Sequence, residues 1–133
     1  MARQWWHLAN YSEPTIGAIN GLVYSAAAVL ASCLDIRIGC ARSAFRFIGA
    51  YRNTVNSTWN LPTIVGIGRG KELPMTARAV QADEAEHIGL LNRVVSSDTL
   101  LNEAIEMGRV IAQNNPIMVR GIKQLLNENV GNE

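Results

Sequence analysis

The stretch 13–38 constrains the fold more than any other part of the chain, because it combines strand, turn and helix signals within one short segment. Thr15–Ile19 alternates and carries β-branched residues, which indicates a buried strand. Asn20-Gly21 is a turn signal. Ser25–Ser32 is small and apolar and predicts a short buried helix, and Leu34–Gly39 predicts a second strand. Strands that alternate with helices favour an α/β fold.

Helical patterns dominate the second half of the chain. Acidic residues in the first turn and Gly89 at the end indicate a helix over Asp83–Ile88. Ser97 or Asp98 caps a helix that runs to about Asn114, because apolar residues recur there at helical spacing. The other expected elements are a helix over 3–11 that buries Trp6, Leu8 and Ala9, a strand over Ala44–Ile48, a loop over 49–60, short helices over Leu61–Val65 and Arg69–Thr76, a strand over Arg93–Val95, and a helix over Ile117–Asn127 opened by Pro116.

Size and composition set the class of protein. The chain has 133 residues and shows no repeat or linker, so we expect one domain over residues 1–133. The net charge of +1 gives no bulk attraction to nucleic acid or to a membrane surface. Cys33 and Cys40 lie among apolar or small residues, which favours buried free thiols in a reducing compartment. These cysteines and the distant His7 and His87 lack metal-ligand spacing, so we expect no metal.

The chain shows no targeting or membrane signal. Trp5, Trp6 and His7 stand where the apolar core of a signal peptide would begin. The longest apolar run, Leu22–Ser32, is shorter than the roughly 18 residues that a membrane-spanning helix needs. We therefore expect a soluble, cytoplasmic protein.

Several segments, taken in order and at near-family spacing, give the chain a specific resemblance. They are Pro14–Gly21 (PTIGAING), Cys33–Ile38 (CLDIRI), Leu61–Leu73 (LPTIVGIGRGKEL), Ala82–Val95 (ADEAEHIGLLNRVV) and Pro116–Asn127. Together they resemble the crotonase superfamily, the enoyl-CoA hydratases and isomerases. The resemblance implies a fold of β-β-α turns wound into a spiral, here incomplete, with a helix-rich C-terminal half.

The resemblance also implies a ligand and a chemistry. Family members bind acyl-coenzyme A thioesters, need no separate cofactor and assemble into trimers or hexamers. They stabilise a thioester enolate with two backbone N–H groups, and preorganised donors of that kind lower the barrier by a few kcal/mol each. The chain corresponds to about half of a family domain, so we expect the loop that carries the first donor to lie before Met1 and the trimer-forming helices to lie after Glu133.

The second oxyanion donor of the family maps to the backbone N–H of Ala26. The family's triple glycine is replaced by Ser25-Ala26-Ala27 in this chain, and the added methyl group crowds a thioester where glycine would allow close approach. Ordinary helix packing explains the same residues equally well. By the same resemblance, the residues expected to contact the substrate are Tyr24, Ser25, Ala27, Ile48 and Tyr51.

Both glutamates of the family's hydratases are missing. Their positions map to Val29 and near Gly49, and no Asp or Glu occurs anywhere from Ile36 to Lys71. A shifted alignment cannot recover a carboxylate that is absent, so hydration by paired carboxylates is not expected. Candidate substitutes for the proton-transferring groups are Tyr51, Arg52, Asn56, Ser57 and Trp59, although loop packing is the simpler interpretation of these residues.

The acid-free stretch is also basic. Its cations are available for the phosphates of coenzyme A or for nucleic acid, but a scattered, solvated basic face is the more frequent explanation: Arg37, Arg42, Arg46, Arg52, Arg69 and Lys71. Asp35 lies inside a predicted strand, and we expect it to play a structural role with Arg37 or a backbone N–H as its partner.

The sequence therefore predicts a crotonase-family protein that binds or acts on an acyl-coenzyme A thioester. If the chain is an enzyme, it is a hydratase-like lyase or an isomerase, with its catalytic residues unassigned. The alternatives are a non-catalytic crotonase-like scaffold, or a truncated fragment that folds only as an oligomer.

Overall fold

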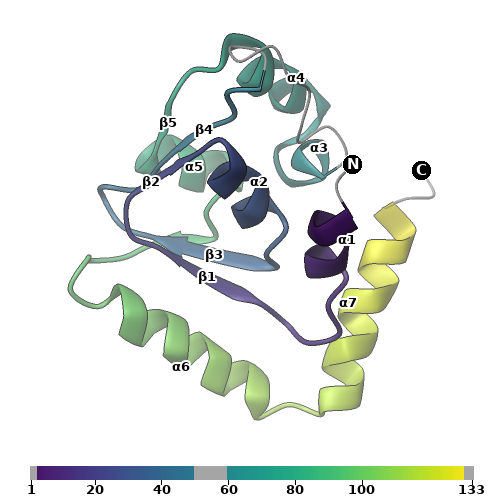
Figure 1. Ribbon diagram of the computed structural model, residues 1–133. Coiled ribbons are helices and arrows are strands. Elements are labelled where there is room, and N and C mark those ends of the chain that lie inside the picture. The colour runs from purple at the N-terminus through teal and green to yellow at the C-terminus, as the bar shows by residue number, and fades with distance from the viewer. Residues whose placement is uncertain (1–2, 50–59, 131–133) are drawn as a thin grey trace.

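The computed structural model of the chain describes residues 3–49 and 60–130. In this part of the chain, helices and strands alternate as the sequence predicts (Figure 1). The elements are α1 (Arg3–Ala9), β1 (Ile16–Ile19), β2 (Leu22–Tyr24), α2 (Ala26–Ser32), β3 (Ile36–Gly39), β4 (Ala44–Arg46), α3 (Leu61–Val65), α4 (Ile67–Thr76), β5 (Val80–Gln81), α5 (Ala82–Ile88), β6 (Arg93–Val94), α6 (Leu100–Ala112) and α7 (Pro116–Val130).

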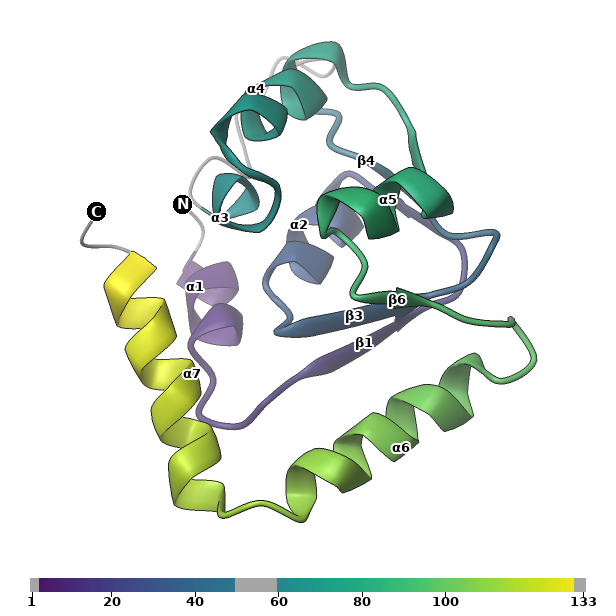
Figure 2. The ribbon, with the colours of Figure 1, turned by 180° about the vertical axis from the view of Figure 1, so that it is seen from behind.

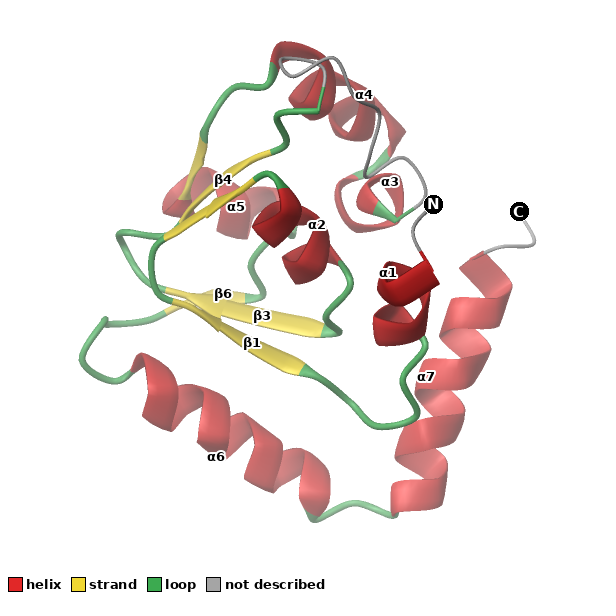
Figure 3. Cartoon of the chain, viewed as in Figure 1, coloured by secondary structure: helices red, strands yellow, loops and turns green. Residues whose placement is uncertain are grey.

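The strands form small sheets, and β1 to β4 alternate between them along the chain (Figure 3). β1 and β3 pair in parallel, and β6 extends that sheet beyond β3. β2 and β4 also pair in parallel, and β5 pairs antiparallel with β4. In each β-β-α unit, the first strand therefore joins one sheet and the second strand joins the other. This alternation is the α/β spiral that the sequence analysis predicts.

The hydrophobic core lies between the two sheets and the helices that cover them. Its main cluster is built from α2, α3, α4, α5 and the strands around them, with Phe45, Phe47, Leu61, Leu73 and Leu90 almost completely buried. A second cluster joins α6 to β3 through Ile38, Cys40, Leu100 and Ala104. α6 thus covers the face of the β1–β3 sheet that points away from α2 (Figure 2). Both cysteines are buried free thiols, as predicted.

Two details of the sequence prediction are wrong. β2 is not predicted, because it is short and Leu22 is 69% exposed, so the segment lacks the apolar alternation of a half-buried strand. Trp6 is expected to be buried, but it is 47% exposed and α1 contributes no buried residue. A small correction concerns α6, which begins after Thr99 rather than after Ser97 or Asp98.

Asp35 joins the start of β1, the start of β3 and α7. Its carboxylate accepts the backbone N–H of Thr15 at 2.9 Å, and its own N–H donates to Thr15 Oγ1 at 2.9 Å. Lys123 of α7 lies 2.8 Å from the same carboxylate and also donates to the carbonyl of Glu13 at 2.8 Å. The expected structural role with a backbone N–H partner is confirmed. The second partner is Lys123, and not Arg37.

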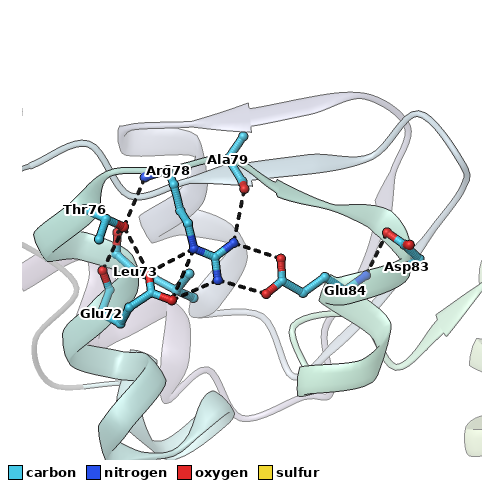
Figure 4. A network of polar contacts seen from close by, with 7 residues as sticks. All are labelled: Glu72, Leu73, Thr76, Arg78, Ala79, Asp83 and Glu84. Atoms are coloured by element: carbon cyan, nitrogen blue, oxygen red, sulfur yellow. Dashed lines mark hydrogen bonds and ion pairs between the residues drawn. The ribbon is translucent and has the colours of Figure 1, made fainter.

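Arg78 links α4 to α5 across the intervening loop (Figure 4). Its guanidinium lies 2.9 Å from Glu72 and 2.8 Å from Glu84, and it donates to both oxygens of each carboxylate. Hydrogen bonds from Arg78 lower the pKa of both glutamates below the ordinary value of 4.5. This network ties α4 to the first turn of α5.

None of the helices in the described ranges, 3–49 and 60–130, has the length and apolar character that a membrane crossing requires.

The Arg78 network predicts a defined pH dependence of stability. A carboxylate whose folded pKa is lowered stabilises the fold above its unfolded pKa and loses that contribution as pH falls. Arg78→Met should cost about 1 kcal/mol of unfolding free energy at neutral pH, since these groups are well exposed. The difference from wild type should shrink as pH falls below 4.5 in urea titrations. Arg109→Met, which removes one exposed pair with Glu106, is the control and should have no measurable effect at any pH. A difference that persists in acid would contradict the assignment.

Gly39 lies where β3 packs closely against its neighbours. A Cβ there would meet Leu91 Cδ1 at 2.7 Å and Ser43 Oγ at 2.8 Å, and Ser43 Oγ is fixed because it donates to the Ile19 carbonyl and accepts the Cys40 N–H. Gly39→Ala should therefore lower the unfolding free energy by about 1–3 kcal/mol.

The matched control is Gly68→Ala in α4, where a Cβ meets no atom within 4 Å. This change should raise the unfolding free energy by about 0.5–1 kcal/mol, because alanine loses less backbone freedom than glycine on folding. Equal effects of the two substitutions in chemical denaturation would show that the space around Gly39 is not restrictive.

Candidate functional site

The turn between β2 and α2 has a backbone conformation that L residues rarely adopt. Ser25 has φ 60° and ψ −124°, and its side chain makes no capping hydrogen bond to α2. The Ser25 N–H donates to the carbonyl of Arg46 at 3.1 Å, which extends the pairing of β2 and β4 by one bond. The strained conformation lets the chain leave the sheet and begin a helix within one residue.

The first turn of α2 presents backbone N–H groups at this point. The N–H groups of Ala28 and Val29 donate to the carbonyl of Ser25, at 3.0 and 3.2 Å. Helix geometry leaves the preceding N–H groups, those of Ala26 and Ala27, without an acceptor inside the helix. The side chains of Ser25, Ala26 and Ala27 are all exposed. A partial positive charge therefore stands at an accessible surface.

Arg46 and Tyr24 fix the turn from the side of the sheet. The Arg46 guanidinium carbon lies 5.6 Å from the centre of the Tyr24 ring, a distance at which a cation attracts an aromatic face. Arg46 Nε also donates to the carbonyl of Ala77 at 2.7 Å. Ala77 ends α4 in a left-handed conformation, with φ 56°. The Tyr24 ring, half-buried, is thereby held beside the turn.

The topology brings some of the predicted site residues to the same edge of the sheet. β2 and β4 are parallel neighbours in the register Tyr24↔Arg46, so Ser25 and the residues after Arg46 follow corresponding strand ends. Ile48 and Gly49 come from that second segment and are buried. The other predicted residues of this region lie outside the described residues: Tyr51, Arg52, Asn56, Ser57 and Trp59.

The positions that map to the family's glutamates are both buried. Val29 is 6% exposed and lies on the first turn of α2, and Gly49 follows β4.

The prediction that Arg37 belongs to a solvated basic face is wrong, because its side chain is buried and donates to the carbonyls of Leu34 and Leu90. Arg46 is likewise engaged by Ala77, whereas Arg69 and Lys71 remain exposed.

Sequence reasoning misses a polar cluster at the other end of α2. Asn60 Nδ2 donates to Ser32 O at 3.0 Å, to Ser32 Oγ at 3.1 Å and to Cys33 Sγ at 3.5 Å, and Asn60 and Ser32 are buried. Burial raises the pKa of the Cys33 thiol, so it remains protonated at neutral pH and is a poor nucleophile. The sequence does not predict this cluster, because Asn60 precedes a helix and its residue type is typical of a helix N-cap. In the described ranges, no group of His, Cys, Asp and Glu side chains is arranged to hold a metal ion.

The strain at Ser25 can be tested directly. Ser25→Gly should raise the unfolding free energy by about 1 kcal/mol, because glycine adopts positive φ without a steric cost and no side-chain cap is lost. Ser25→Val should lower it by a comparable amount, since a β-branched residue is least tolerant of this conformation. Urea denaturation of both variants measures the two effects. If Ser25→Gly destabilises the chain, the turn is not strained.

Comparison with known proteins identifies the family. The protein family described as enoyl-CoA hydratase/isomerase matches residues 1–133. A short-chain-enoyl-CoA hydratase of Clostridioides difficile is 35% identical over 123 residues, which cover 88% of this chain and 77% of that protein. A short-chain-enoyl-CoA hydratase of Clostridium acetobutylicum is 36% identical over 118 residues, which cover 86% of this chain and 45% of that protein.

Solved structures agree. An enoyl-CoA hydratase/isomerase of Cupriavidus metallidurans superposes with a TM-score of 0.92 at 28% identity, over 97% of this chain and 50% of that one. A probable enoyl-CoA hydratase/isomerase of Mycobacterium abscessus gives 0.89 at 30% identity, over 96% and 50%. The chain thus spans about half the length of these solved structures and of the Clostridium acetobutylicum relative. It has the crotonase fold over nearly its whole length, and it belongs to the enoyl-CoA hydratase/isomerase family.

Proposed function

We propose that the chain binds an acyl-coenzyme A thioester, and that the backbone N–H of Ala26 donates a hydrogen bond to the thioester carbonyl. The observation that carries this proposal is the strained turn at Ser25, which leaves the first amides of α2 at an accessible surface. A single donor polarises a carbonyl, while the family's chemistry relies on two. Tyr24, Ser25, Ala27, Ile48 and Tyr51 are the proposed contacts of the acyl chain and the thioester.

We further propose that the chain does not add water to the bound thioester. Hydration needs groups that activate water and deliver a proton. Val29 is apolar, and the stretch from Ile36 to Lys71 carries no carboxylate. The chain is therefore proposed to be a thioester-binding member of the family without hydratase activity. Its proposed location is the cytoplasm.

A second candidate is an assembly subunit that forms a homotrimer or hexamer. The feature that favours it is a group of exposed apolar side chains on α7: Ile117, Met118, Ile122, Leu125 and Leu126. Apolar patches of this kind mark interaction surfaces. The mass of the protein in solution, measured by light scattering, separates this candidate from a monomeric binding protein.

The binding proposal is tested by titrating crotonyl-coenzyme A into the protein in a calorimeter, while the absorbance of the conjugated thioester is followed in parallel. We expect binding heat and an unchanged absorbance. Absence of binding would refute the proposed function, and loss of absorbance would refute the absence of hydratase activity.

Ala26→Pro removes the proposed donor, and proline is tolerated at the first position of a helix. The affinity should fall about fivefold, the worth of one hydrogen bond to a neutral carbonyl. Ala27→Pro removes the next N–H of the same turn and is the comparison variant; because Ala27 is itself a proposed contact, a smaller loss of affinity than that of Ala26→Pro is expected. Circular dichroism of both variants verifies that α2 is retained. Equal losses in the two variants would show that Ala26 is not the donor.

A further inference from the structure

A cavity of about 550 Å³ lies between α1, α7 and the C-terminal end of α2. It is separate from the Ala26 turn, because that turn is at the N-terminal end of α2, on the order of 10 Å away along a seven-residue helix. The walls contributed by α1 and α3 are partly apolar, with Trp6, Ala9 and Ile64. The opposite wall is polar and includes the side chains of Ser32, Arg37 and Asn60.

Buried polar side chains gather at this cavity. In the described part of the chain the buried polar and charged residues are Ser32, Arg37, Ser43 and Asn60, and all of these except Ser43 line the cavity. Burial of polar groups costs free energy unless each of them is hydrogen-bonded. Each polar atom of Arg37 and Asn60 is therefore expected to have a hydrogen-bond partner.

Arg37 is a buried cation that contacts carbonyl groups rather than a carboxylate. Its Nε donates to Leu90 O at 2.6 Å, and its Nη1 donates to Leu34 O at 2.6 Å and to Ala31 O at 3.5 Å. Within the described residues, Nη2 has no hydrogen-bond partner and no carboxylate lies within ion-pair distance of the guanidinium. The side chain is 5% exposed. Arg37 thus keeps two N–H donors without a partner among the described residues in a place that solvent hardly reaches, and its charge is stabilised only at longer range, by Asp35.

Asn60 keeps an unsatisfied acceptor in the same cavity. The Ser32 hydroxyl has one hydrogen, and it donates to Val29 O at 2.7 Å rather than to Asn60 Oδ1, which lies 3.4 Å away. Among the described residues, Asn60 Oδ1 therefore receives no good hydrogen bond, while Asn60 Nδ2 is fully used. The cavity wall offers a charged donor at Arg37 and a neutral acceptor at Asn60.

We propose that this cavity binds a small hydroxycarboxylate. The carboxylate accepts hydrogen bonds from Arg37 Nη2, the hydroxyl donates to Asn60 Oδ1, and the hydrocarbon part packs on Trp6 and Ile64. Two carboxylates also line the cavity, but Asp35 is paired with Lys123 at 2.8 Å, and Glu128 lies on an exposed part of α7. The buried charge that a ligand meets is therefore that of Arg37. This inference is independent of the proposed thioester binding.

The experiment uses the whole chain and three probes that differ by one group. 2-Hydroxyisocaproate carries both the carboxylate and the hydroxyl, isocaproate lacks the hydroxyl, and 2-hydroxyisocaproamide lacks the charge. Binding is followed by proton–nitrogen NMR spectra, in which the amides of Ser32 and Cys33 and the Trp6 indole should shift. Affinity should fall about tenfold for the amide and severalfold for isocaproate, since hydrogen bonds to charged groups are the stronger ones.

Ala9→Phe adds a ring to the α1 wall of the cavity, and it should abolish the shifts. Gln4→Phe places the same ring on an exposed position of α1 that does not line the cavity, and it should leave them unchanged. The proposal is overturned if millimolar 2-hydroxyisocaproate shifts none of these signals, if the amide binds as well as the acid, or if Ala9→Phe binds like wild type.

Discussion

The parallel pairing of β1 with β3 and of β2 with β4 is the constraint on which the rest of the structure depends. Two parallel strands cannot be joined by a tight turn, so the chain must travel between them. It does so through the second sheet and α2, which places the small residues Ala28 and Ala31 in the core. On this route Ser25 is the single residue that connects β2 to α2.

The pairing also explains what the sequence could reveal. The strand at Ile16–Ile19 and the helix after Ser25 follow from local patterns, since β-branched alternation and small apolar residues act at the level of one element. Gly89 ends α5 with φ 90°, as its position after Ile88 indicates. β2 could not be found in this way, because its exposed Leu22 is placed by pairing with Ala44 and not by burial.

The same distinction between local patterns and distant contacts applies to the candidate site. The resemblance maps the family's oxyanion donor to Ala26, which begins α2 directly after Ser25, and the topology places Ile48 and Gly49 after the neighbouring strand. Arg37 and Asn60 could not be assigned from sequence, because their environment is made by segments far apart in the chain. Arg37 donates to Leu90, and Asn60 donates to Ser32. The sequence predicts Arg37 as a surface charge, whereas the fold surrounds it with the carbonyl groups of Ala31, Leu34 and Leu90.

The attachment of α7 has a consequence of its own. The helix carries apolar side chains that face solvent, and it is joined to the body of the protein by polar contacts, among them Arg120 to Glu13 at 2.7 Å, Lys123 to Asp35 at 2.8 Å and Asn127 to the Ala9 carbonyl at 3.1 Å. Salt screens the attraction between the exposed side chains of Arg120 and Glu13, but it acts much less on the Lys123–Asp35 pair, whose side chains are 9% and 24% exposed. Concentrated salt should therefore weaken the Arg120 contact and leave the last helix attached chiefly through Lys123 and Asn127, with the two sheets and their core intact.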